Sequence, residues 1–156
     1  MNRAISTLAT VSIITVAGCS TTATLFPIDG PLSKQIPLPT LVARVDGITG
    51  NTGDISMDLS AGERCTGKWS SIAPQSATFS TVTAIGSGNS RLGPAWARVF
   101  GSGFTMSNLP GVNRGEAMLI CPLGTVIQVE FYTGSGTANG TGVAMDNKGN
   151  TFKVLF

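Results

Sequence analysis

Apolar and polar residues alternate along most of this 156-residue chain, and this period of two constrains the fold more than any other feature. Successive side chains of a β-strand point to opposite faces, so the alternation predicts half-buried strands. Residues 41–46, for example, read Leu, Val, Ala, Arg, Val, Asp. Turn-forming residues interrupt the pattern about every ten residues, as in small all-β domains. We therefore expect an all-β chain, folded as a small antiparallel β-sandwich or barrel of about eight short strands.

The expected strands form a single β domain from residue 40 to residue 156. They occupy residues 41–46, 54–59, 64–69, 76–85, 117–121, 127–132, 143–145 and 152–156. Cys65 and Cys121 fall on the apolar phase of their strands, and Val143 and Met145 are expected to point inward as a pair.

Residues 86–113 interrupt the alternation and form the longest irregular segment of the domain. Pro94 can occupy the first position of a short helix through residues 95–100. Tryptophan and arginine are enriched in protein interfaces, so Arg91, Trp96 and Arg98 are candidate partner-binding residues. In the alternative interpretation, Trp96 packs with nearby phenylalanines to cap the open end of the β-core.

The N-terminus has the pattern of a secretory signal. Arg3 precedes an uncharged, mostly apolar run over residues 4–17, which is shorter than the roughly 20 residues that a membrane-spanning helix needs. The run ends in Val16-Ala17-Gly18-Cys19. This ending resembles the lipobox of bacterial lipoprotein precursors: an aliphatic residue, two small residues and a cysteine.

The resemblance implies that residues 1–18 are a signal peptide that is cleaved before Cys19. Cys19 would then carry a thioether-linked diacylglycerol and usually a third, amide-linked acyl chain such as palmitate. In such lipoproteins an aspartate after the lipidated cysteine favours the inner membrane; Ser20 stands there in this chain, which favours the periplasmic leaflet of the outer membrane.

Residues 19–39 are expected to be a flexible tether between that lipid and the domain. Prolines 27, 31, 37 and 39 lie in this segment, which has no sustained periodicity. Proline removes backbone donors and favours extended conformations.

If Cys19 is lipidated, Cys65 and Cys121 remain in an oxidising compartment, where an even number of cysteines predicts one disulfide. Two free thiols are the alternative. A metal site would need further ligands near these cysteines, and the chain contains no histidine.

The composition excludes several classes of function. Without histidine there is no Ser-His-Asp or Cys-His catalysis and no His-ligated zinc or haem. A net charge of +2 is too small for an electrostatic nucleic-acid binder. Asp54 and Asp58, the one carboxylate pair considered, would lie about 13 Å apart on a strand, farther than a glycosidase needs. We expect no enzymatic activity, no metal and no cofactor.

Two non-catalytic functions remain, and an enzyme is the third and least favoured hypothesis, because the chain lacks acid–base groups for catalysis. The favoured one is a non-catalytic cell-envelope lipoprotein with a structural or accessory binding role in the periplasm. It would be attached to the membrane through Cys19, with other envelope proteins as its expected partners. The alternative is a lipid-anchored inhibitor of a wall-degrading hydrolase: small β-barrel lipoproteins that inhibit lysozyme are similar in size and anchoring, but their inhibitory motif has no counterpart here.

Overall fold

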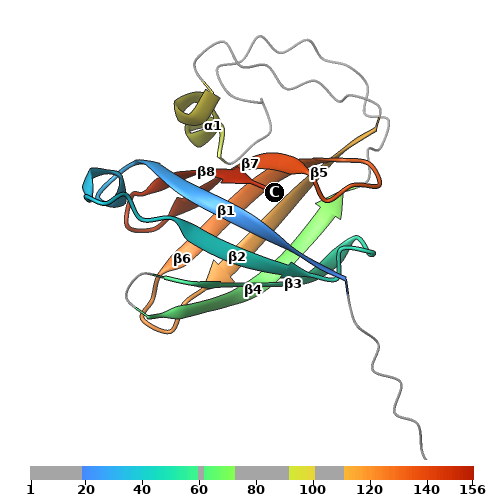
Figure 1. Ribbon diagram of the computed structural model, residues 1–156, viewed down its shortest axis with the longest axis horizontal. Helices are drawn as coiled ribbons and strands as arrows, with labels where there is room; N and C mark the ends of the chain where they lie inside the picture. The colour runs from blue at the N-terminus through green and yellow to red at the C-terminus, as the bar shows by residue number, and fades with distance from the viewer. Residues whose placement is uncertain (1–18, 60–61, 73–91, 101–110) are drawn as a thin grey trace, which may run out of the picture.

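A computed structural model describes residues 19–59, 62–72, 92–100 and 111–156. Eight strands within these ranges form a closed antiparallel barrel in which each strand pairs with its neighbours in sequence and the last pairs with the first (Figure 1). The strands are β1 (Ser20–Asp29), β2 (Leu41–Asp46), β3 (Thr52–Asp58), β4 (Arg64–Ile72), β5 (Val112–Ile120), β6 (Val126–Gly134), β7 (Gly140–Asp146) and β8 (Thr151–Leu155). The all-β prediction is confirmed, with the barrel as its architecture. The strand expected at 76–85 lies outside the described residues.

The tether expected at residues 19–39 is wrong, because Ser20–Asp29 is a strand of the barrel. β1 pairs through residues 20–25 with β2, where Ala23 faces Ala43, and through residues 24–29 with β8, where Leu25 faces Val154. A 3-10 turn, η1 (Leu32–Lys34), then leads into β2. The register shifts next to Pro27, and such an irregularity is where a strand tolerates a residue without a backbone N–H.

Apolar side chains point into the barrel, as the alternation predicts for most strands. The buried interior residues are Ala23, Leu25, Leu41, Ala43, Val45, Ile55, Met57, Cys65, Trp69, Ala117, Leu119, Cys121, Ile127, Val129, Phe131, Ala144, Phe152 and Val154. In this molecule the core is therefore the lumen of the barrel.

The orientation expected for β7 is wrong. Ala144 belongs to the interior cluster, whereas Val143 and Met145 pack in a separate cluster on the outer wall. Helix α1 (Gly93–Phe100) covers that part of the wall and contacts β7, β8 and β1. A strand that is covered on its outer face by a helix is apolar on both faces, so alternation alone cannot assign its phase.

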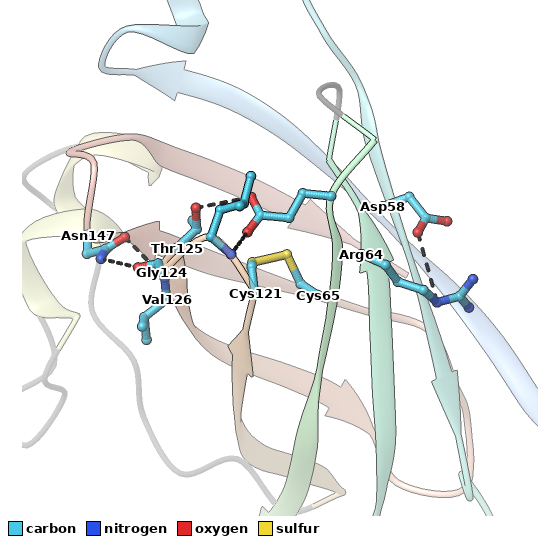
Figure 2. Close-up of a disulfide and its surroundings, with 10 residues drawn as sticks. Asp58, Arg64, Cys65, Cys121, Gly124, Thr125, Val126 and Asn147 are labelled. Atoms are coloured by element: carbon cyan, nitrogen blue, oxygen red, sulfur yellow. Dashed lines mark hydrogen bonds and ion pairs between the residues drawn. A yellow bond between two sulfur atoms is a disulfide. The ribbon is translucent and has the colours of Figure 1, made fainter.

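The disulfide between Cys65 and Cys121 is confirmed, and it joins neighbouring strands at one end of the barrel. Polar groups surround it there (Figure 2). The buried Glu63 carboxylate accepts hydrogen bonds from the backbone N–H of Leu123 (2.6 Å) and from the hydroxyl of Thr125 (3.4 Å). The amide of Asn147 donates to the carbonyl of Gly124 (2.9 Å). These contacts link the turns between β3 and β4, β5 and β6, and β7 and β8, so we call this the closed end.

The fold predicts that the disulfide is a major stabilising element. Replacing both cysteines, in Cys65→Ala/Cys121→Ala, should lower the free energy of unfolding by about 2–5 kcal/mol, because the unfolded chain loses a constraint across 56 residues. Urea unfolding followed by circular dichroism measures this difference. Cys19→Ser is the matched control: Cys19 is exposed and outside the disulfide, and this variant should keep the parent stability. Equal stability of the double variant and the parent would contradict the prediction.

Candidate functional site: a cavity at the open end of the barrel

The half of the lumen opposite the disulfide is hollow. A cavity of about 540 Å³ lies there, which is within the usual size of small-molecule sites. An eight-stranded barrel is just wide enough either to be filled by its side chains or to hold one small ligand. This barrel does both: Leu41, Ile127 and Phe152 help to fill the closed end, and none of them lines the cavity.

Small inward residues on neighbouring strands create the hollow half. Ala23, Ala43 and Ala117 line it from β1, β2 and β5, where larger side chains would fill it. On β5, Gly115 lies under the ring of Phe131, which occupies the space that a Cβ on Gly115 would need. An aromatic ring that covers a glycine of the next strand is a recognised way to stabilise a curved sheet.

Three aromatic side chains form part of the cavity wall. Phe131 lies between Trp69 (ring centroids 6.3 Å apart) and Phe156 (5.4 Å). The indole N–H of Trp69 donates to the carbonyl oxygen of Asp46 (2.8 Å), so its polar atom is satisfied by the barrel itself. The wall therefore presents an apolar aromatic surface to any occupant.

The rim of the cavity is polar but uncharged. Hydroxyl and amide side chains lie at the strand ends and loops of this open end: Thr21, Thr49, Asn51, Ser71, Asn113, Thr133 and Thr137. The described residues that line the cavity include no Asp, Glu, Lys or Arg. Such a cavity suits an apolar body with a neutral, hydrogen-bonding end, because a charged group would enter it without a counter-charge.

Cys19 lies on this same rim. It lines the cavity, it is exposed, and its carbonyl accepts a hydrogen bond from the backbone N–H of Gly47 (3.2 Å). Because β1 begins at the next residue, Ser20, the cysteine is held at the mouth by the barrel itself.

Two of the predicted partner-binding residues, Trp96 and Arg98, do not line the cavity. Trp96 is only 1% exposed and packs from α1 onto the outer wall of the barrel, where it stacks on Phe100 and meets the edge of Tyr132. This burial agrees with the core interpretation of Trp96, although its place is the side of the barrel and not the open end. Arg98 is exposed and pairs with Asp29 (3.5 Å), while Arg91 lies outside the described residues. The partner-binding role of these residues stays a prediction.

The sequence analysis missed a carboxylate pair on this wall. Glu116 and Glu130 face each other on β5 and β6, and Arg114 bridges them with distances of 3.2 and 3.3 Å. Glu130 is 3% exposed, and its second oxygen accepts a hydrogen bond from the indole of Trp96 (2.8 Å). One oxygen of Glu130 is thus paired with Arg114 of β5, and the other holds α1 against the barrel through Trp96. The pairing of β5 with β6 brings these two carboxylates together, so their separation in the sequence gave no sign of the pair.

The same cluster perturbs the single tyrosine of the chain. Burial raises the pKa of Tyr132 above its ordinary value of 10.0; the charge of Arg114 lowers it, and those of Glu130 and Glu116 raise it. The phenol therefore stays neutral at physiological pH, as expected of a packing residue.

Comparisons with known proteins leave the cavity as the main guide to function. No family model, no curated protein and no solved structure matches this chain. In the described ranges no three acidic, cysteine or histidine residues are grouped so that they could hold a metal ion. None of the helices that the structure describes is long and apolar enough to cross a membrane.

The position of α1 predicts different costs for two of its side chains. Trp96→Ala should lower the free energy of unfolding by about 3–5 kcal/mol, because it removes a fully buried ring. Arg98→Ala should cost less, about 1–2 kcal/mol, because its ion pair with Asp29 is exposed to solvent and it loses one further hydrogen bond, to the hydroxyl of Thr151. Urea unfolding of the two variants measures both values. A stable Trp96→Ala variant that loses a binding partner would instead favour the interface interpretation.

Proposed function

We propose that this protein is a non-catalytic lipoprotein of the bacterial cell envelope whose barrel binds an apolar small molecule. The observation that carries this proposal is the apolar cavity of about 540 Å³ with an uncharged rim. Concave, mostly apolar sites with a few polar groups at one end are typical of small-molecule binding.

The place of Cys19 supports the attachment. The residue that the lipobox resemblance marks for lipidation is exposed at the mouth of the cavity. Two or three acyl chains on one residue anchor a protein stably, whereas a single chain binds only marginally. The outer membrane is the proposed site, with the barrel in the periplasm, because Ser20 follows the cysteine.

The chemistry of the cavity favours binding over catalysis. General acid–base catalysis needs a titratable group within hydrogen-bonding distance of the substrate. Apart from the thiol of Cys19, which the proposal assigns to lipid, the described lining offers only hydroxyl, amide and apolar groups. The alternative of a hydrolase inhibitor stays a prediction, and no feature of the described barrel favours it.

Ligand binding is tested with N-phenyl-1-naphthylamine, a neutral apolar dye that fluoresces strongly when it leaves water. The purified protein should bind about one dye molecule per chain. Ala43→Leu places extra atoms in the cavity and should weaken dye binding at least tenfold. Val42→Leu is the matched control: the neighbouring side chain on β2 points outward and is 53% exposed, so dye affinity should stay within twofold of the parent. A parent protein that binds no dye would overturn the proposed function.

The attachment is tested separately by metabolic labelling with radioactive palmitate in a diderm bacterium. The parent chain should incorporate label and shorten by 18 residues, whereas Cys19→Ser should carry no label and accumulate as precursor. Cys65→Ala retains the lipobox and should be labelled normally. Label on the Cys19→Ser chain equal to that on the parent would reject the lipid attachment.

A further inference from the structure

We propose that the cavity is a site for the acyl chain of a lipid with an uncharged head group, and that this lipid enters from the bilayer to which Cys19 is attached. This inference rests on the proposed function and names its ligand class. It follows from three features of the open end: the position of the anchor, the depth of the cavity, and the chemistry of the rim.

The position of the anchor brings the mouth to the membrane. β1 begins one residue after Cys19, and the backbone of Cys19 is hydrogen-bonded to Gly47 in the β2–β3 loop. No flexible spacer therefore separates the lipidated residue from the barrel. Lipid chains that leave Cys19 start at the rim of the cavity, so their insertion into a bilayer holds this end of the barrel close to the membrane surface.

The depth of the cavity fits a narrow, elongated occupant. On β1 the lining runs from Thr21 to Leu25, which corresponds to about 13 Å along a strand. Below the rim this channel is bounded by aliphatic and aromatic side chains, and the filled closed end stops it. An acyl chain can enter end-on with its methyl terminus towards Leu25, while its head group stays at the mouth.

The rim determines the head group. The hydroxyls of Thr21, Ser71 and Thr133 and the amides of Asn51 and Asn113 can hydrogen-bond to glycerol hydroxyls and ester oxygens. A carboxylate or phosphate would meet no positive side chain among the described lining residues. Monoacylglycerol combines the required features, since it has one acyl chain and a neutral, hydroxyl-bearing head group.

The acyl site is tested with Trp69 as the reporter. Trp96→Phe leaves Trp69 as the only tryptophan, on the cavity wall. The protein used is the chain from residue 19 with Cys19→Ser, since all eight strands of the closed barrel lie after that residue. Its N-terminus is acetylated, so that no α-amino charge lies at the mouth of the cavity. The probe is a monoacylglycerol brominated along its acyl chain, because bromine quenches nearby indole fluorescence. We expect saturable quenching with one ligand per chain and at least tenfold weaker binding by the corresponding fatty acid at pH 8, where it is charged.

Matched variants show whether the probe enters the cavity. Ala43→Leu should weaken quenching at least tenfold, and Val42→Leu should leave it within twofold of the parent. Ala23→Leu, on the facing strand, serves if Ala43→Leu fails to fold, and native mass spectrometry counts bound ligand independently of fluorescence. Absence of both quenching and bound mass would overturn the acyl site, as would binding that neither inward variant weakens.

The source of the lipid is tested with the full lipidated protein carrying Trp96→Phe. The protein is reconstituted into phosphatidylcholine vesicles that contain a few per cent of the brominated monoacylglycerol. If the mouth draws lipid from the bilayer, Trp69 should be quenched more strongly than in the unlipidated Cys19→Ser chain at the same lipid concentration. Quenching equal to or below that of the unlipidated chain would overturn the bilayer as source. Full occupancy by the chain's own anchor is one way to produce that result.

These outcomes separate the inference from the proposed function. If the naphthylamine dye binds and Ala43→Leu blocks it, the cavity is a small-molecule site whatever the brominated lipid does. A chain that binds the dye but not the monoacylglycerol overturns only the ligand class. A chain that binds neither overturns both.

Discussion

The pairing of β1 with both β2 and β8 is the constraint on which the rest of the structure depends. Backbone hydrogen bonds along Ser20–Asp29 turn an open meander of seven strands into a closed barrel without free edges. A closed wall encloses a lumen, and a lumen can hold a cavity that an open sheet of these residues could not. The same pairing fixes Cys19 at the rim, because this residue directly precedes the closing strand (Figure 1).

The two ends of the lumen differ, since one is packed and the other is hollow. At the closed end the disulfide and large apolar side chains leave little space, and the hydrogen bonds of Glu63 and Asn147 tie three turns together. Figure 2 shows the disulfide and Asn147 among these turns. At the open end alanines and glycines face inward, so the wall curves but the space stays empty. An empty apolar half forgoes the packing contacts that a filled core would make, and this cost is reasonable where a ligand supplies the missing contacts.

Much of the fold could be predicted from the sequence, since alternation directly reports a half-buried strand. The strand phases, the disulfide and the short helix follow from local patterns and from cysteine parity. Closure could not be predicted, because it depends on Ser20–Asp29, where Pro27 and the prolines that follow the strand made the segment resemble an extended tether. The inward face of β7 could not be predicted for another reason. Helix α1 buries the outer face of this strand, so the outward Val143 is as apolar as the inward Ala144.

The cavity itself lies beyond sequence reasoning for a physical reason. A small inward residue gives the same sequence pattern in both cases: when side chains of the opposite wall fill the space above it, and when that space stays empty. The role of Ala43 and Ala117 as cavity-lining residues follows only from the folded barrel, which places them around one cavity together with Trp69 and Phe131. The anchor changes meaning in the same way. With a spacer of twenty residues, a lipid on Cys19 would only restrict the barrel to the neighbourhood of the membrane. Without the spacer, the proposed lipid would also orient the barrel, with the mouth towards the bilayer.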